Sequence, residues 1–294
     1  MTGVTFPLIA RRRVLGLPFG GLHSFRRGHG SDVAGSRPYR PGDDVKRIDW
    51  NASARLSHAR AGDEFVVREH FAEEAPRAVV LCDRRPSMSL FPDAWPWLRK
   101  PDATRHALRL IGDSVLAARG LLGYLDHAQG EIFWRPPRSE RELGPVALER
   151  PFAAPEDALA LGLEHLVEQR RDLPAGTFVF VLSDFLVQPS RDAWLRVLER
   201  RFELVPVVIQ DPVWEQSFPD VSGTVVPLEI GAVGLTAPEA ADRRATNEHR
   251  LRELVRLLRS LDAEPVLVSS HEWRDVVLAF LTWADQRQLS GGRR

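Results

Sequence analysis

The chain has almost no cysteine and almost no lysine. Cys82 is the only cysteine among 294 residues, which excludes an intrachain disulfide and a metal site made of several cysteines, and suits a reducing cytoplasm. Lys46 and Lys100 are the only lysines among the 40 basic residues, so arginine carries the positive charge. The planar guanidinium of arginine favours bidentate pairing with carboxylates. Codon bias in a GC-rich genome is the alternative explanation.

Net charge and long apolar runs are missing as well. The 40 basic residues are balanced by 40 acidic ones, which argues against a general binder of nucleic acids or anionic membranes. The most apolar stretches, 177–187 and 276–284, are shorter than the roughly 18 apolar residues of a membrane span. The N-terminal arginines follow the apolar residues, the reverse of a secretory signal. We therefore expect a cytoplasmic protein with no nucleic-acid partner and no direct membrane insertion.

Signatures of nucleotide binding and of covalent catalysis are also lacking. The glycine-rich stretch GLPFGGLHSFRRGHG contains neither G-x-G-x-x-G nor GK[ST] and is not a phosphate loop. No nucleophile stands in a recognisable arrangement with a general base, and His58 and His70 lack the spacing of metal ligands. The residues therefore indicate a protein that is not an enzyme.

After Pro76 the sequence alternates between buried strands and amphipathic helices. Continuous apolar runs predict strands, and apolar residues at helical spacing predict helices. The strands are expected at 77–83, 121–128, 130–136, 176–185, 202–209 and 264–270, and the helices at 102–120, 155–171, 191–201, 239–260 and 272–287. This order predicts an α/β fold with a doubly wound, mostly parallel sheet. We expect residues 76–290 to form this domain, and residues 1–75 to form an irregular, partly β N-terminal extension.

Two of the strongest predicted strands end in an aspartate. Asp83 follows AVVLC, and Asp184 follows FVFVLS. In a doubly wound sheet, sites lie outside the carboxyl ends of the strands, where the strand order reverses. We therefore expect the two carboxylates to lie side by side, with a cation or hydrogen-bond donors between them to relieve their repulsion. The alternative is that each aspartate caps the helix that follows it.

The stretch RPYRPGDDVKRIDWNASAR, residues 37–55, is dense in charge. It holds four arginines, one lysine and three aspartates. Its Pro-Gly pair predicts a turn, and Asp43 or Asp44 is expected to cap a short helical turn that runs to Trp50. Ion pairs between its arginines and aspartates would stiffen this loop.

We expect Tyr39, Ile48 and Trp50 to dock this loop on the core. A docked and stiffened loop of this kind is either a structural element or a partner-binding face, and its residues give little support to catalysis. The residues expected at a partner-binding face are Arg40, Asp43, Asp44 and Arg47.

Five segments together resemble one bacterial protein family of unknown function, which is built around a von Willebrand factor A-like domain. In order along the chain they are GLHSFRRGHGSD, RPYRPGDDVKRIDWNASAR, VLCDRRPSMS, VLSDF and DPVW. The resemblance covers most of the chain, and PGDDVKRIDW is its most specific part. Members of this family are often encoded beside MoxR-type AAA+ ATPases.

The resemblance implies a metal-ion-dependent adhesion site at the carboxyl edge of the sheet. In related domains a D-x-S-x-S loop, a distant threonine and a further aspartate hold a divalent cation, which also binds an acidic residue of a partner. Asp83 matches the first position, Ser87 the last serine and Asp184 the final aspartate. Arg85 replaces the middle serine, and the stretch FAAPEDAL offers no threonine.

This departure predicts a degenerate site. Arg85 is expected to lie between Asp83 and Asp184 and to supply the charge that Mg²⁺ or Mn²⁺ would otherwise supply. The alternative is that Arg85 points to solvent while the aspartates bind backbone amides. We expect no tightly bound metal and no other cofactor.

The resemblance implies a non-enzymatic protein–protein interaction module. Such a module would act with a MoxR-type AAA+ ATPase in the remodelling or maturation of a client protein that the sequence does not identify. The alternative is a metal-dependent hydrolase or phosphoesterase that uses clustered aspartates, and it requires four carboxylates to converge on one ion. Those four are Asp43, Asp44, Asp83 and Asp184. A purely structural domain is the third possibility.

Overall fold

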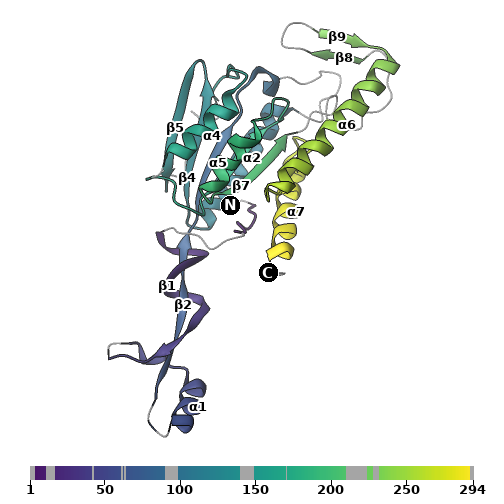
Figure 1. Ribbon diagram of the computed structural model, residues 1–294. Coiled ribbons are helices and arrows are strands. Elements are labelled where there is room, and N and C mark those ends of the chain that lie inside the picture. Colours follow the sequence, from purple (N-terminus) through teal and green to yellow (C-terminus); the bar gives the residue numbers. More distant parts are fainter. Residues whose placement is uncertain are drawn as a thin grey trace.

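A six-stranded sheet forms the centre of the protein. The computed structural model describes residues 4–10, 17–41, 43–60, 62, 64–89, 99–139, 149–169, 171–209, 224–227 and 232–291 (Figure 1). The strand order in this sheet is β10-β7-β6-β3-β4-β5. The strands are β3 (Arg77–Cys82), β4 (Leu121–Ala128), β5 (Glu131–Arg138), β6 (Phe178–Ser183), β7 (Glu203–Ile209) and β10 (Val266–Val268).

All neighbouring strands of this sheet run parallel except β5, which returns antiparallel beside β4. The tight turn between β4 and β5 contains Gln129 and Gly130, with φ angles of 55° and 78°. Left-handed conformations at both central positions suit a two-residue hairpin, and glycine adopts one without steric cost. This turn joins the two strands that the sequence predicts at 121–128 and 130–136.

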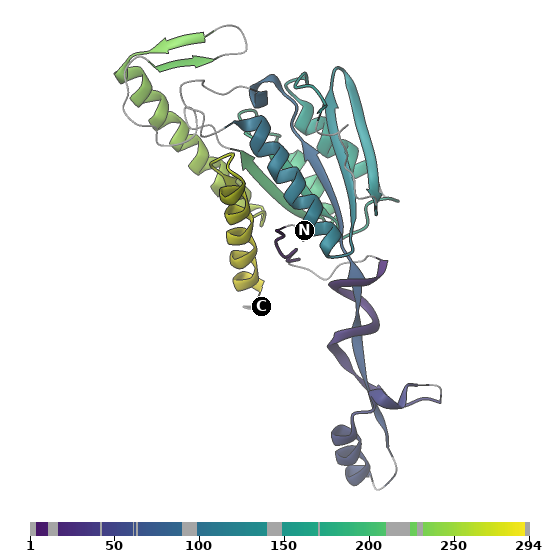
Figure 2. The ribbon, with the colours of Figure 1, turned by 180° about the vertical axis from the view of Figure 1, so that it is seen from behind.

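Helices cover both faces of the sheet. On one face lie α2 (Lys100–Ala117) and α7 (Trp273–Gly291), which are in front in Figure 2. On the other face lie α4 (Ala158–Glu168), α5 (Arg191–Glu199) and the C-terminal part of α6 (Ala237–Ser260). Because parallel strands are buried on both faces, their side chains divide between two apolar clusters, which explains the continuous apolar runs of the sequence. The predicted α/β fold with a doubly wound, mostly parallel sheet is confirmed.

A long two-stranded arm projects from the sheet (Figure 1). In this arm β1 (Leu17–Pro38) pairs antiparallel with β2 (Val66–Ala75), and the register shifts at several points. The tip of the arm carries the 3₁₀ turn η1 (Val45–Arg47) and helix α1 (Trp50–Arg60). Only Pro76 separates β2 from β3, so the arm leaves from the amino edge of the parallel sheet.

An N-terminal segment and a small hairpin accompany the arm, the sheet and its helices. Phe6 and Leu8 are buried in the core on the side of α2 and α7, and the ring of Phe6 lies 4.8 Å from that of Phe280. A small hairpin of β8 (Thr224–Pro227) and β9 (Ala232–Leu235) precedes α6. Within the described part of the chain, no helix is long and apolar enough to cross a membrane. The division expected between residues 75 and 76 stays a prediction.

Candidate site at the carboxyl edge of the sheet

The candidate site lies where the strand order reverses. From β3 the chain passes to β4 and β5 on one side, and it then crosses to β6 on the other side of β3. β3 and β6 are hydrogen-bonded neighbours, and the N–H of Asp83 donates to the carbonyl of Leu182 at 2.9 Å. Asp83 and Asp184 therefore leave adjacent strands at the same edge, and the predicted adjacency of the two aspartates is confirmed.

Each aspartate first organises its own loop. Asp83 Oδ1 accepts from the N–H of Arg85 at 2.9 Å, and Asp184 Oδ1 accepts from the N–H of Leu186 at 3.0 Å. These are turns in which a carboxylate binds the backbone two residues later. Neither carboxylate caps the α-helix that follows it, because the N-cap of α2 is Arg99 and the N-cap of α5 is Ser190.

The guanidinium of Arg85 lies between the two carboxylates. Its Nε donates to Asp83 Oδ2 at 3.0 Å, and its Nη2 donates to Asp184 Oδ1 at 3.1 Å. The hydroxyl of Ser183 adds a hydrogen bond of 2.6 Å to Asp83 Oδ2. Arg85 is only 4 % exposed, so the alternative in which it points to solvent is not observed.

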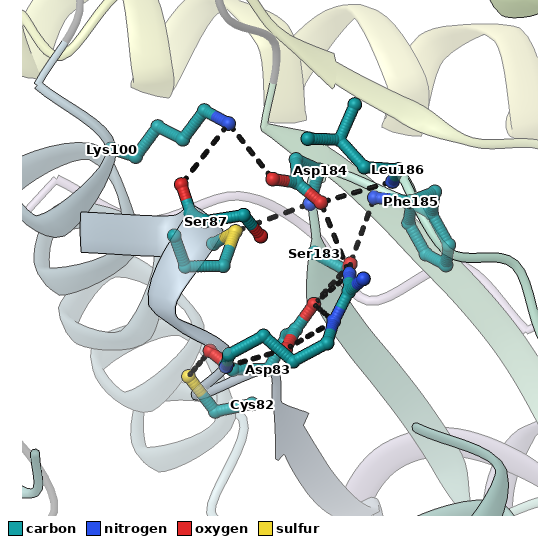
Figure 3. A network of polar contacts seen from close by, with 10 residues as sticks. Cys82, Asp83, Ser87, Lys100, Ser183, Asp184, Phe185 and Leu186 are labelled. Carbon is teal, nitrogen blue, oxygen red and sulfur yellow. Dashed lines mark hydrogen bonds and ion pairs between the residues drawn. The ribbon is translucent and has the colours of Figure 1, made fainter. Parts of the chain in front are cut away.

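A second cation, Lys100, completes the cluster and is not foreseen by the sequence analysis. Its Nζ lies 2.8 Å from Asp184 Oδ2 and 3.4 Å from the carbonyl oxygen of Ser87 (Figure 3). Lys100 is 1 % exposed and stands in the first turn of α2. A lysine is unfavourable at the positive end of a helix dipole. A lysine at the start of a helix, in a chain with only two lysines, is the feature of the sequence that indicates a special role for Lys100.

The cluster of Asp83, Arg85, Lys100 and Asp184 is balanced in charge. Burial alone would raise the pKa of Asp184, but the charges of Lys100 and Arg85 and their hydrogen bonds hold that pKa below its usual value. Burial would lower the pKa of Arg85, and pairing with both aspartates raises it instead. Asp184 therefore stays ionised, and Arg85 links it to Asp83 inside the protein.

This donor set does not fit a divalent cation. The carboxylate oxygens of Asp83 and Asp184 are already bound by Arg85, Lys100 and Ser183. The hydroxyl of Ser87 is buried and makes no hydrogen bond in the described part of the chain, so it takes no part in the network. Among all the residues that the structure describes, no group of three or more histidine, cysteine or acidic side chains is arranged to hold a metal ion.

A second buried network lies beside the first. Arg84 Nη2 donates to the hydroxyl of Tyr124 at 2.9 Å, and this hydroxyl donates to Asp126 Oδ2 at 2.8 Å. Arg150 binds Asp126 through two of its nitrogens, at 2.8 and 3.0 Å. Burial raises the pKa of Tyr124 well above its usual value, so its hydroxyl remains a donor. In the sequence, the single aspartate within the apolar run LLGYLDHA is the feature that indicates this network.

The charged stretch 37–55 lies at the tip of the arm and not against the sheet. Its helical turn is η1, capped by Asp44, and α1 begins at Trp50. Trp50 is 59 % exposed, so the expectation that it docks the loop on the core is wrong. Trp50 contacts Phe65 of the arm instead, with ring centroids 6.1 Å apart. The sequence does not predict the long β1–β2 pairing, which carries the loop away from the core.

Ion pairs stiffen the tip as expected. Arg37 binds Asp43 through two hydrogen bonds of 2.6 Å, and the N–H of Arg40 donates to Asp43 Oδ2 at 2.7 Å. These contacts lower the pKa of Asp43 to about 2. Asp49 pairs with Arg68 at 2.7 Å. The side chain of Arg47 and the DPVW motif lie outside the described residues.

The tip and the carboxyl edge are at opposite ends of the molecule (Figure 1). β2 and β3 follow one another directly, from Val66 to Cys82. At a rise of about 3.3 Å per strand residue, they separate the tip from the carboxyl edge by roughly 50 Å. Asp43 and Asp44 therefore do not converge with Asp83 and Asp184 on one ion, as the hydrolase alternative requires.

The chain is similar to three curated mycobacterial proteins. The uncharacterized proteins Rv1480 of Mycobacterium tuberculosis and Mb1516 of Mycobacterium bovis are each 26 % identical to it over 302 residues, covering 98 % of this chain and 90 % of theirs.

Two solved structures share a distant likeness. One is an aerotolerance-related membrane protein from Bacteroides fragilis, with a TM-score of 0.42 and 10 % identity. The other is the conserved hypothetical protein BatB from Bacteroides thetaiotaomicron, with a TM-score of 0.40 and 12 % identity. Each likeness covers 74 % of this chain and all of the other chain. Similarity at this level says nothing about function.

The family profile described as "Protein of unknown function DUF58" matches residues 35–253. This match includes the tip of the arm, both aspartates of the carboxyl edge and the central strands. It spans well over half of the chain, and the chain therefore belongs to the DUF58 family of proteins of unknown function.

Proposed function

We propose that this chain is a von Willebrand factor A-like, non-enzymatic protein–protein interaction module. It works with a MoxR-type AAA+ ATPase in the remodelling or maturation of a client protein. The ATPase partnership rests on the resemblance described above, and the interaction role rests on the arm. Because its partner consumes ATP and its single cysteine needs no oxidising compartment, we place the module in the cytoplasm.

The observation that carries the proposal is the stiff, aromatic tip that the arm holds away from the core. Exposed aromatic residues on a rigid support are typical of sites that bind other proteins. Arg40 lies at the exposed tip, and Asp43 and Asp44 shape its backbone. Together with Arg47, these residues are the partner-binding set that the proposal assigns.

The cluster at the carboxyl edge supports a structural role for that edge. Its two aspartates are compensated by Arg85 and Lys100, which belong to the same chain. In a domain that uses a metal there, the ion binds an acidic residue of the partner. A cluster already closed by internal cations leaves partner binding to another surface, and the arm is that surface.

The proposal is tested by co-purification from the native cell. The tagged full chain is isolated with a non-hydrolysable ATP analogue present, and its companions are identified by mass spectrometry beside a control that carries the tag alone. We expect a MoxR-type ATPase to be enriched, and the purified pair to bind in a calorimetric titration. An enrichment without any AAA+ ATPase, repeated with ATP and with ADP, would contradict the partnership.

A further inference from the structure

We propose that the tip of the arm, residues 37–68, docks an acidic protein segment that places apolar side chains against Trp50 and Phe65. This inference rests on the proposed function and adds the chemistry of the partner to it. Its basis is an exposed aromatic cluster that is held rigid and surrounded by basic side chains.

The apolar part of the tip consists of large side chains that face solvent. Trp50 is 59 % exposed, Phe65 is 42 % exposed, and Val45 of η1 is 56 % exposed. The ring of Phe65 contacts both Trp50 and Tyr39 edge to face, at centroid distances of 6.1 and 6.5 Å. Exposed apolar side chains in contact with one another mark interaction sites more reliably than isolated ones.

Hydrogen bonds fix the backbone beneath these rings. The N–H of Tyr39 donates to the carbonyl of Phe65 at 2.8 Å, which ties the two sides of the arm together. The hydroxyl of Ser53 accepts from the N–H of Val66, and the hydroxyl of Ser57 binds both backbone groups of Glu64. A preformed surface loses little conformational entropy on binding, so its contacts contribute more to affinity.

The charge that the tip presents is positive. Asp43 and Asp49 are bound by Arg37 and Arg68, and Asp44 caps η1. Helix α1 contains two arginines and no acidic residue. Among the described side chains of the tip, the exposed basic ones are those of Arg40, Lys46, Arg55, Arg60 and Arg68. Arg60 pairs with Glu64 at 3.7 Å and Arg68 with Asp49, which leaves Arg40, Lys46 and Arg55 as the main source of the positive charge. A basic rim around an apolar centre is complementary to an acidic segment with apolar anchors.

A protein segment fits this surface better than a nucleic acid or a membrane does. Residues 37–68 contain seven basic and five acidic residues, an excess that neutralises few phosphates. The five acidic residues of the same segment also offset most of the attraction to an anionic lipid surface. Tryptophan, tyrosine and arginine are the residue types that dominate the binding energy of protein interfaces.

The test uses the full chain and four defined probes. The first is a fluorescent helical peptide made of glutamate and leucine, and the second is a peptide of equal length and charge with serine in place of leucine. The others are a single-stranded DNA oligonucleotide and phosphatidylglycerol vesicles. We expect the glutamate–leucine peptide to bind most tightly in fluorescence anisotropy and in flotation assays. Trp50→Ala should weaken this binding about thirty-fold, the effect of losing an interface hot spot.

Matched variants separate docking from folding. Arg55→Glu changes an exposed charge of α1 and should weaken peptide binding about five-fold at low salt, with a smaller effect at high salt. Leu278→Ala removes a 62 % exposed apolar side chain from α7 and should leave binding unchanged. Equal binding of both peptides, tighter binding of DNA or vesicles, or binding that survives both tip variants would overturn the inference.

Failure of this inference is distinguishable from failure of the proposed function. A MoxR-type ATPase that co-purifies equally with the unmodified chain and with Trp50→Ala would leave the ATPase partnership standing and refute the tip as its docking surface. Tip-dependent peptide binding without any co-purified ATPase would support the docking surface and refute the ATPase partnership.

Discussion

Replacing Lys100 by methionine should destabilise the protein through Asp184. Methionine keeps the length and the apolar stem of the side chain and removes the ammonium group. In the unmodified chain this group lies 2.8 Å from Asp184 Oδ2 and is 1 % exposed. After the replacement, one buried carboxylate loses a cationic partner that water does not replace.

The magnitude follows from the geometry. At 2.8 Å and an effective dielectric constant of about 20, the attraction amounts to roughly 6 kcal/mol. The cost of burying the ammonium offsets part of this attraction, and breaking a buried pair by removing one partner typically costs about 3 to 5 kcal/mol. Arg85 remains 3.1 Å from Asp184, so we expect about 3 kcal/mol, or a fall in Tm of about 6 to 12 °C.

The assay is chemical denaturation at neutral pH, with Lys46→Met as the control. Lys46 is the other lysine of the chain and is exposed on the arm, so its loss should change the free energy of unfolding by less than about 0.5 kcal/mol. If Lys100→Met changes the stability as little as Lys46→Met does, the ammonium does not compensate Asp184 and the reasoning is refuted.

Acid provides a second check on the same pair. Because the folded-state pKa of Asp184 lies below its usual 3.8, its ion pairs stabilise the fold fully above that value. This contribution is lost as the pH falls through the folded-state pKa. The difference in stability between Lys100→Met and the unmodified chain should therefore narrow in strong acid, where a protonated Asp184 needs no cation.

Three further predictions concern the arm and the second network. Trp50→Ala should lower the free energy of unfolding by less than about 1 kcal/mol, as measured by denaturant titration. Trp194→Ala, which removes a fully buried ring from the core, should lower it by about 3 to 5 kcal/mol. Equal losses would show that Trp50 is a core residue. Asp43 should keep the tip ordered from neutral pH down to about pH 4, and the tip should lose order as the pH approaches the Asp43 pKa of about 2. A folded-state pKa below the usual value means that the ionised carboxylate stabilises the folded tip at every pH above that usual value. Hydrogen exchange of residues 37–50 that rises already near pH 6 would contradict this expectation. Tyr124→Phe should lower the free energy of unfolding by about 1 to 3 kcal/mol, since Arg84 and Asp126 each lose a buried hydrogen bond. Tyr39→Phe, which changes the other tyrosine of the chain, should change this free energy little. Equal effects of the two variants in thermal melts would argue against the network.

Much of the α/β core was predictable because burial on both faces leaves a clear pattern. The six strands of the sheet and the five helices around it fall within a few residues of the ranges expected from apolar runs and helical spacing. For example, the strand expected at 176–185 is Phe178–Ser183, and the helix expected at 239–260 is Ala237–Ser260. In the last of these helices, Trp283 is 1 % exposed and belongs to the core, whereas Trp273 is only partly buried.

The arm was not predictable by the same means. β1 and β2 pair with each other in an arm that projects from the central sheet, and their sequences show no period-two alternation that would mark them as strands. Helix α1 has little amphipathic pattern, because it packs on the arm through Ser53 and not through an apolar stripe. A tryptophan in a charged loop suggested burial, but in the structure it serves as an exposed surface residue.

The candidate site was predictable in part. Strand ends and the strand order place Asp83 and Asp184 together, and Arg85 follows from its position in the loop. Lys100 comes from a helix that begins 17 residues after Asp83 in the sequence, and only the packing of α2 against β3 and η2 brings its ammonium to Asp184. Contacts of this kind depend on tertiary structure and leave no local pattern.

The central claim is that Arg85 and Lys100 take the place of a divalent cation at the carboxyl edge. Calorimetric titration of the purified full chain with Mg²⁺ and Mn²⁺ tests it most directly, beside an Arg85→Ser, Lys100→Met double variant. The guanidinium of Arg85 and the ammonium of Lys100 lie 3.1 and 2.8 Å from the carboxylate of Asp184. Their positive charges should oppose the binding of a divalent ion by several kcal/mol. We therefore predict no binding by the unmodified chain up to millimolar metal, and binding with a metal-dependent rise in Tm only in the double variant. Micromolar binding by the unmodified chain would contradict the account.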